Sequence, residues 1–276
     1  MLYTLKEVMD LGEKGNFAIP AFNVYTAENA IAVIQAAEEM RAPVIIQMYS
    51  RLFDSGIAKF LAPSILKAID EMSVPCAFHL DHGANEGVVT RAIRYGASGV
   101  MIDASTLELD DNIAVTKRVV DMASAAGVSV EGELGHIGSA ANGDENGSYT
   151  EVADAVKYVN ETGIAALAIM VGTAHGHYKQ TPKLAIDRIA EIHAATKAHL
   201  VLHGGSGVPD DQMQAAVKAG IRKVNFGTDV CYSYIDGCKQ ADPTKMALDV
   251  YLRYPTETVK QFAIEKIKLL GADGQV

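Results

Sequence analysis

The sequence predicts an α/β fold, a (β/α)8 TIM barrel with additional C-terminal helices. Three observations support this fold class: eight strand-like runs alternate with helix-period segments, no linker or low-complexity stretch separates them, and 276 residues is a length at which α/β barrels form one domain. Strands that alternate with helices form parallel βαβ units with right-handed crossovers. Eight such units in succession favour a closed barrel over an open, doubly wound sheet.

The predicted strands are short, mostly apolar runs, and helix-period segments fill the intervals between them. The strands are expected at Ala18–Val24, Val44–Tyr49, Cys76–Leu80, Gly99–Asp103, Ser129–Leu134, Ala165–Val171, His199–His203 and Lys223–Phe226. The helices are expected at Ala27–Arg41, Ile57–Met72, Asn85–Tyr95, Asp110–Ala126, Val152–Thr162, Pro182–Thr196 and Asp210–Ala219. Proline suits the first turn of a helix, as at Pro182 and Pro209, and glycine suits helix ends, as at Gly96, Gly127, Gly163 and Gly220.

Residues 242–276 follow a different pattern and are predicted to be a C-terminal helical extension of a single domain, 1–276. From Asp242 the chain reads as one or two amphipathic helices, interrupted at Pro255. Such an extension would cover the barrel or form a contact between subunits.

Composition narrows the class of partner. The net charge is −10 and lysine and arginine are spread singly, which disfavours nucleic acid and anionic membranes. No apolar run approaches the ~18 residues that span a bilayer, and the N-terminus lacks the pattern of a signal peptide. The chain has 3 cysteines, an odd number, and their spacing is not that of a zinc-binding motif. This fits a reducing compartment. We therefore expect a cytoplasmic protein.

Three histidines follow predicted strands three, six and seven: His82 in HLDHG, His175 in GTAHG and His203 in HGGSG. Any one of them alone is more often structural, and His177 is a competitor for the role of His175. Barrel enzymes, however, place their chemistry at the carboxyl ends of the strands, where all three fall. Three imidazoles on zinc leave a fourth position open for water or substrate. The pattern predicts a catalytic metal centre.

A metal with an open position polarises a carbonyl oxygen, which makes the adjacent proton removable and stabilises an enediolate. Asp81, directly before His82, is a candidate general acid/base, or alternatively a carboxylate that orients a ligand histidine. Asp103 and Glu133 point to the same end of the barrel. They would hold a second or alternative metal position, hydrogen-bond the histidines, or form a polar layer over the core.

Two glycine-rich segments, HGGSG and NFGTD, follow strands seven and eight. Loops at these positions frequently bind phosphate through backbone amides and helix N-termini. The candidate residues are Gly204, Gly205, Ser206, Asn225, Gly227 and Thr228. The long segment of residues 136–149, rich in glycine, asparagine and serine, is predicted to be a mobile active-site loop or disorder without function.

Over nearly its whole length the chain resembles the class II, metal-dependent ketose-bisphosphate aldolases, which include fructose- and tagatose-bisphosphate aldolases. The motifs that carry the resemblance, in order, are FAIPAFNV, HLDHG, EGELGHIG, GTAHG, HGGSGVP and KVN. It implies that His82, His175 and His203 bind zinc and that Asp81 exchanges a proton with the aldehyde-side hydroxyl. It also implies that dihydroxyacetone phosphate contacts Gly176, Gly204, Gly205, Ser206, Asn225 and Thr228, with Asn23 and Ser50 near the substrate. A homodimer or homotetramer, and a monovalent cation (Na+ or K+) beside the phosphate, are further implications.

The chain departs from the family at positions that affect the aldehyde side. Gly227 stands where fructose-bisphosphate aldolases usually carry aspartate, and Arg51 stands where many relatives have smaller or different residues. The acidic pair usual in the long loop is out of register, with Asp144 and Glu145 nearby. The aldehyde partner is therefore left open.

The expected function is reversible, metal-dependent aldol cleavage of a phosphorylated ketose, similar to fructose- or tagatose-1,6-bisphosphate, into dihydroxyacetone phosphate and an aldehyde. Its place would be in carbohydrate metabolism, such as glycolysis. A sugar-phosphate isomerase or epimerase on the same barrel is one alternative, because it also needs carbonyl polarisation and a base. A phosphosugar-binding protein without catalysis is the other.

Overall fold

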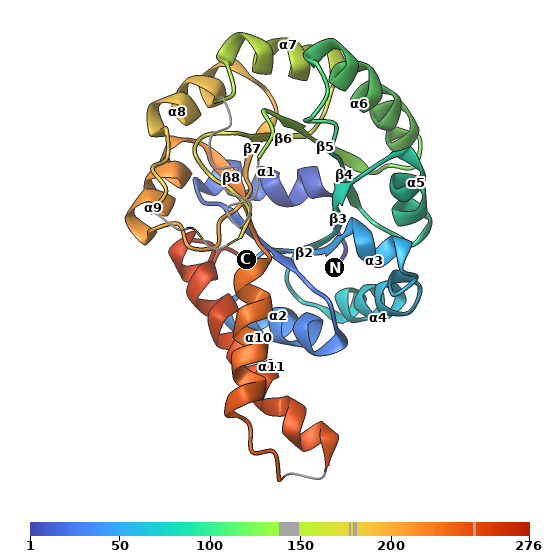
Figure 1. The fold of residues 1–276 in the computed structure, drawn as a ribbon, viewed down its shortest axis with the longest axis vertical. Coiled ribbons are helices and arrows are strands. Elements are labelled where there is room, and N and C mark those ends of the chain that lie inside the picture. Colours follow the sequence, from blue (N-terminus) through green and yellow to red (C-terminus); the bar gives the residue numbers. More distant parts are fainter. Residues whose placement is uncertain (138–148, 177, 179–180, 245–246) are drawn as a thin grey trace.

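The eight predicted strands form one closed, parallel barrel in sequence order, with helices around the outside (Figure 1). The computed structural model describes residues 1–137, 149–176, 178, 181–244 and 247–276. Its strands are β1 Ile19–Asn23, β2 Val44–Tyr49, β3 Cys76–Gly83, β4 Gly99–Ile102, β5 Ser129–Leu134, β6 Ala166–Ile169, β7 His199–Leu202 and β8 Ile221–Phe226. Pairing of β8 with β1 closes the ring, so the predicted barrel is confirmed.

The seven predicted helices between the strands are also present. They are α2 Ala27–Met40, α4 Ala58–Glu71, α5 Glu86–Arg94, α6 Leu109–Ser124, α7 Val152–Thr162, α8 Ile186–Ala195 and α9 Asp210–Ala219. The glycines expected at helix ends, Gly96, Gly127, Gly163 and Gly220, all have positive φ, a conformation that glycine adopts without strain.

The positions predicted for the two prolines are wrong. Pro209 is the N-cap residue of α9 and not a first-turn residue. Pro182 precedes α8, which begins only at Ile186. The Gln212 side chain of α9 explains the late start: it accepts from the Leu184 N–H and donates to the Pro182 carbonyl, so these backbone groups are bound outside a helix.

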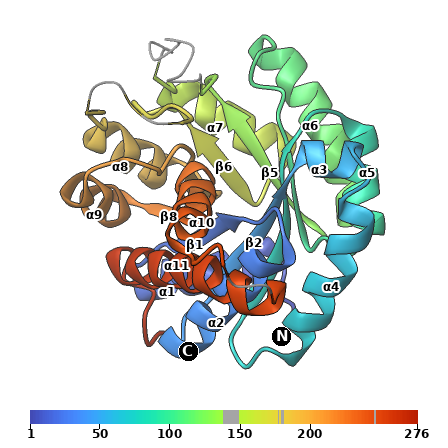
Figure 2. The same cartoon turned by 60° about the horizontal axis from the view of Figure 1, so that its bottom comes forward.

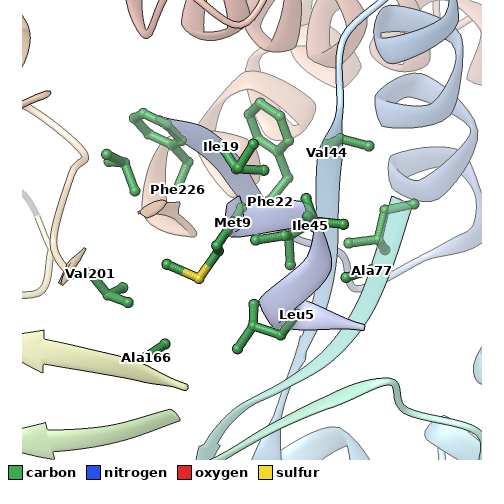
Figure 3. Packing of buried hydrophobic residues seen from close by; sticks show 14 of the residues in the cluster. Leu5, Met9, Ile19, Phe22, Val44, Ile45, Ala77, Ala166, Val201 and Phe226 are labelled. Carbon is green, nitrogen blue, oxygen red and sulfur yellow. The ribbon is translucent and has the colours of Figure 1, made fainter. Parts of the chain in front are cut away.

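The described residues contain three further helices that were not predicted: α1 Leu5–Gly15, α3 Ser50–Asp54 and α10 Thr228–Gln240. Helix α1 begins with a capping box in which Thr4 and Glu7 satisfy each other's backbone N–H groups. Its buried face points Leu5 and Met9 towards inward-facing strand residues such as Ile45 (Figure 3). Helix α1 therefore closes the amino-terminal end of the barrel.

The C-terminal extension is one long helix, α11 Leu248–Leu269, which packs against α2 and α10 (Figure 2). It continues through Pro255, so the predicted interruption there is wrong. Pro255 is buried against Gly237 of α10, where a Cβ would lie 2.6 Å from the Pro255 Cα. Close packing of α11 on α10 at Gly237 compensates for the backbone hydrogen bond that Pro255 removes from α11.

The inside of the barrel changes from apolar to polar along its axis. Inward-facing residues near the amino-terminal end, such as Ile19, Ile45 and Val201, are apolar and buried (Figure 3). Farther along the same strands the inward-facing residues are polar, and they are buried as well: Asn23, Gln47, His79, Asp81, Glu131, Glu133, His203, Lys223 and Asn225. Buried polar groups require partners, so this half of the barrel is the candidate location of a functional site.

In the part of the chain that is described, no helix combines the length and the apolar character needed to cross a membrane.

Candidate active site and metal centre

A pocket of about 580 Å³ opens at the carboxyl ends of the strands, a size typical of small-molecule sites. Eleven of the residues singled out by the sequence line it: Asn23, Asp81, His82, Asp103, His175, Gly176, Gly204, Ser206, Asn225, Gly227 and Thr228. Arg51, which departs from the family pattern, also lines the pocket. The structure thus brings together residues from the ends of β1, β3, β4, β6, β7 and β8.

The three histidines each direct one ring nitrogen towards the same point. Nε2 of His82 lies 3.2 Å from Nε2 of His175 and 3.0 Å from Nδ1 of His203. One ligand atom from each histidine lies within 4.8 Å of the other two. The competitor His177 lies outside the described residues.

The second nitrogen of each ring has a different acceptor. His82 Nδ1 lies 2.8 Å from the Asp103 carboxylate, His175 Nδ1 lies 3.2 Å from the Ile137 carbonyl, and His203 Nε2 lies 2.8 Å from the Glu131 carboxylate. Such partners fix the tautomer and the orientation of a metal-binding histidine. Asp103 therefore takes the orienting role that the sequence also allowed for Asp81.

An irregularity at the end of β3 lets two consecutive residues reach the pocket. Side chains alternate along a strand, so Asp81 and His82 would normally face opposite sides. The β3–β4 register shifts between Leu80 and Gly83, and His82 adopts a left-handed φ of 47°. Both side chains consequently line the pocket. Backbone strain of this kind clusters at functional sites.

The electrostatics of the histidines suit a cation. Burial lowers the pKa of His175 to about 3 and also lowers the pKa of His203, so both rings are neutral and free to bind a metal. Burial alone would lower the pKa of His82, but the surrounding carboxylates, led by Asp81, raise it to about 9. The site around His82 is thus rich in negative charge.

Glu133 provides a direct test of whether a metal fits. Its Oε2 is buried 3.6 Å from His203 Nδ1 and has no hydrogen-bond partner among the described residues. Burial, and the Asp103 carboxylate, raise its pKa to about 8. An unpartnered carboxyl oxygen beside three convergent imidazoles fits a divalent metal, for which both groups are ligands. His82, Asp103 and Glu133 form a second group whose ligand atoms lie within 4.8 Å of one another.

Asp81 is held by two amide side chains. Its Oδ2 accepts from Asn23 Nδ2 at 2.7 Å and its Oδ1 accepts from Asn225 Nδ2 at 3.1 Å. Gln47 in turn donates to the Asn23 carbonyl oxygen at 2.8 Å. Burial alone would raise the pKa of Asp81, but His82, His203, Lys223 and the hydrogen bond from Asn23 bring it below its usual value. The carboxylate is therefore ionised and fixed in orientation.

The loops after β7 and β8 meet at one side of the pocket. Ser206 Oγ accepts from the Asp229 N–H at the start of α10, which links the two loops. Gly204 has a positive φ, and a Cβ there would lie 2.4 Å from the Ala174 carbonyl oxygen. Gly227 is the N-cap residue of α10, so that helix begins at the pocket with its positive end.

Two of the predicted substrate contacts are not on the pocket lining. Ser50 is buried as the first residue of α3. Gly205 packs under the loop, where its N–H donates to the Asn225 carbonyl. Of the loop predicted at 136–149, residues 138–148, including Asp144 and Glu145, lie outside the described part of the chain.

Five further lining residues were not singled out by the sequence reasoning: Tyr25, Tyr49, His136, Ile137 and Cys231. Of these, His136 and Ile137 lie in the loop predicted at 136–149. Tyr49 ends a predicted strand and Tyr25 follows one, so their positions could have identified them as lining residues. The position of Cys231 could not, because α10 was not predicted. Both tyrosine rings lie beside the Arg51 guanidinium, whose carbon is 5.4 Å from the Tyr25 centroid and 4.8 Å from that of Tyr49.

The chain is similar to known proteins over nearly its whole length. The family model described as "Fructose-bisphosphate aldolase class-II" matches residues 3–275. A "6-phospho-5-dehydro-2-deoxy-D-gluconate aldolase" of Bacillus licheniformis is 35% identical over 279 residues, covering 99% of this chain and 96% of the relative. A "Sulfofructosephosphate aldolase" of Alkalicoccus urumqiensis is 32% identical and covers 98% and 96%. The crystal structure of the YdjI aldolase from Escherichia coli K12 superposes with a TM-score of 0.90 at 32% identity, covering 100% of this chain and 99% of that one.

Proposed function

Because this chain belongs to the class II fructose-bisphosphate aldolase family, whose members are lyases that act on phosphorylated sugars by aldol cleavage, we propose that it reversibly cleaves a phosphorylated ketose into dihydroxyacetone phosphate and an aldehyde. The observation that carries this proposal is the convergence of three histidine nitrogens, from His82, His175 and His203, at a pocket that Asp81 also lines. The proposed substrate class is a ketose similar to fructose- or tagatose-1,6-bisphosphate. Relatives are named for other phosphosugars, so the lining of the pocket must indicate the chemistry of the aldehyde half.

His82, His175 and His203 would hold the metal, for which we propose zinc. When bound, the ion would supply a Lewis acid for the ketose carbonyl. Asp103, the Ile137 carbonyl and Glu131 would keep the three rings oriented towards it. Glu133 and Asp103 would serve a second or alternative metal position with His82.

Asp81 would take the proton from the hydroxyl on the aldehyde side as the carbon–carbon bond breaks, and would return it during synthesis. Its ionised state suits the cleavage direction, in which it must accept a proton. Asn23 and Asn225 occupy both carboxylate oxygens, so the carboxylate cannot rotate away from the substrate. Asn225 and Asn23 also line the pocket and would contact the substrate hydroxyl groups.

The phosphate of the dihydroxyacetone half would bind between the loops after β7 and β8. Gly176, Gly204, Ser206, Gly227 and Thr228 line this side of the pocket, and α10 begins there. Backbone N–H groups at a helix N-terminus favour an anion in a chain whose net charge is −10. A monovalent cation beside the phosphate, and contacts from Ser50 and Gly205, stay predictions from the family resemblance.

Arg51, which follows β2 and lines the pocket, would bind a negative group on the aldehyde half. It makes no ion pair with any carboxylate in the described ranges, and the Tyr25 and Tyr49 rings hold its guanidinium plane. Guanidinium groups recognise phosphate and carboxylate through paired hydrogen bonds. An anionic aldehyde half, such as one with a phosphate, is therefore the substrate class that this pocket favours.

We further propose that the chain acts as a homodimer or homotetramer in the cytoplasm, as a single domain with residues 242–276 as its extension. Support for assembly comes from apolar side chains of α10 and α11 that are exposed in the single chain. They are Ile235 at 48%, Leu248 at 67%, Val250 at 41% and Tyr254 at 49%. Exposed apolar patches of this kind mark interaction surfaces.

The zinc-loaded protein, incubated with dihydroxyacetone phosphate and a panel of aldehydes, tests the proposal. Carbon–carbon bond formation with at least one aldehyde, lost on chelation of the metal, is the expected result. No product from any aldehyde, together with no metal-dependent proton exchange on dihydroxyacetone phosphate, would overturn it. Interconversion of sugar phosphates without triose products would identify an isomerase or epimerase, and binding without turnover would identify a phosphosugar-binding protein.

A further inference from the structure

A buried pair of opposite charges, Glu131 on β5 and Lys223 on β8, adjoins the three histidines. The Lys223 Nζ lies 2.8 Å from the Glu131 Oε2, and both side chains are 0% exposed. Strands β6 and β7 separate β5 from β8, so the pair crosses the inside of the barrel. Ala166 of β6, the register partner of Glu131, is small and leaves room for the crossing.

The other oxygen of the same carboxylate contacts a proposed metal ligand. Glu131 Oε1 lies 2.8 Å from His203 Nε2. His203 Nδ1 faces the other two imidazoles, 3.0 Å from His82 Nε2. A nitrogen that binds a metal carries no proton, so a neutral His203 that binds through Nδ1 must be protonated at Nε2. Its Nε2–H then donates to Glu131.

Lys223 stabilises the ionised form of this acceptor, which is fully buried. An ionised carboxyl group is costly to bury unless it is paired and hydrogen-bonded. Among the described residues, Lys223 is the cationic side chain that meets Glu131; His79 Nε2 lies 3.4 Å from Oε2 but without hydrogen-bond geometry. Carboxylates that accept from the far nitrogen of a metal-bound histidine fix its tautomer and raise its basicity.

We propose that Glu131 and Lys223 are positioning residues that hold His203 in the tautomer that binds metal through Nδ1, and thereby tighten metal binding. This inference rests on the proposed function, because it takes the three histidines as the metal ligands. It goes beyond that function by assigning a role to an ion pair that touches neither substrate nor metal.

The double variant Glu131→Gln/Lys223→Met tests the proposal, since it removes both charges and nearly preserves volume. The amide oxygen introduced at position 131 would still accept from His203, so the charge is what the variant removes. The zinc Kd, measured by competition with a chromophoric chelator, should rise about tenfold to a hundredfold. The visible absorption spectrum of the Co2+-loaded protein should also shift, because one ligand becomes less basic. A merely structural ion pair would leave both readouts unchanged.

Tyr158→Phe is the matched control. Tyr158 is fully buried and hydrogen-bonds Asn112 and Thr116 but none of the three histidines. It should therefore bind zinc as the wild type does. A double variant that binds zinc within twofold of the wild type, with the same cobalt spectrum, overturns the inference while the proposed function stands. A wild-type protein that binds no zinc overturns both.

A measurement on the wild type covers the case in which the double variant does not fold. In the zinc-loaded protein with 15N-labelled histidine, NMR should show one metal-bound histidine that is coordinated through Nδ1 and protonated at Nε2. The other two should be coordinated through Nε2. Absence of a histidine in the first state overturns the inference.

Discussion

At the scale of single residues, the pocket separates proton transfer from metal binding. Asp81 hydrogen-bonds two amides and no histidine, whereas Asp103 and Glu131 hydrogen-bond the rings. Asp81 can therefore be changed without removing an orienting partner from the metal site. This allows the chemical step and the metal to be tested independently.

Asp81→Asn should lower kcat by about 10²- to 10⁴-fold, the usual contribution of a general acid or base. Zinc content, measured by atomic absorption, should stay at the wild-type level, because no ligand or ring partner is lost. Unchanged turnover would exclude the acid/base role. Loss of both zinc and activity would instead assign Asp81 to the metal site.

Arg51→Met should lower kcat/KM for an anionic aldehyde, such as glyceraldehyde 3-phosphate, by about tenfold to a hundredfold, because a charge-assisted hydrogen bond contributes about 1.5–3 kcal/mol. For neutral glyceraldehyde kcat/KM should change little. Arg51→Lys is the control that keeps the charge, and it should recover part of the loss. Equal effects on both aldehydes would show that Arg51 has no role in recognising the anion.

At the scale of elements, helix α1 is fastened to the barrel by polar contacts as well as by Leu5 and Met9. Asp10 lies 2.8 Å from Lys6 within the helix and 2.8 Å from His199 at the start of β7. Burial alone would raise the pKa of Asp10, but Lys6 and His199 lower it from 3.8. A carboxylate with a lowered pKa in the folded state stabilises the fold above its unfolded pKa.

Asp10→Asn should therefore lower the free energy of unfolding at pH 6, by less than about 1 kcal/mol because the pair is partly exposed. The difference from the wild type should shrink as the pH falls below 3.8 and through the lower folded pKa, where the carboxylate becomes protonated. Urea unfolding of both proteins at several pH values measures this. Asp70→Asn, at an exposed position of α4, should show a smaller difference; a difference for Asp10→Asn that does not depend on pH would contradict the assignment.

Helices and strands were predictable from the sequence where the chain repeats the alternation of strand and helix. They were less predictable elsewhere. The strands and the helices between them follow one alternation, which is why all eight strands were found. Helix α1 precedes the first repeat, although Thr4 and Glu7 form a capping box that was readable. Helices α3 and α10 begin directly at the pocket, in sequence that reads as loop.

The site was predictable as a set of residues and not as a geometry. Strand ends identified His82, His175 and His203, because parallel strands bring their carboxyl ends together. The choice of ring nitrogen depends on Asp103, Ile137 and Glu131, which come from other strands and loops. Glu131 and Lys223 were not singled out, since their pairing across the barrel exists only after closure.

At the scale of the whole molecule, α10 and α11 extend from one side of the ring of helices (Figure 1). Ile235→Glu on α10 should shift the protein from a dimer or tetramer to a monomer, because a charge cannot be buried unpaired in an interface. Sedimentation velocity at matched concentration measures the shift. Leu107→Glu changes a side chain of similar exposure, 47% against 48%, outside this extension and should leave the assembly intact. A monomeric wild type would contradict the proposal.

The left-handed backbone conformation at His82 lowers stability at a residue that the proposed activity needs. A residue with a Cβ is strained at φ 47°, where glycine is not. In the metal-free protein, His82→Gly should therefore unfold with a free energy about 1 kcal/mol higher than that of His82→Ala, while neither variant should bind zinc normally. Chemical denaturation of the two variants measures the difference, and equal stabilities would contradict it. Selection for stability alone would favour glycine at this position. The histidine therefore indicates that some stability is given up for a side chain that the site needs.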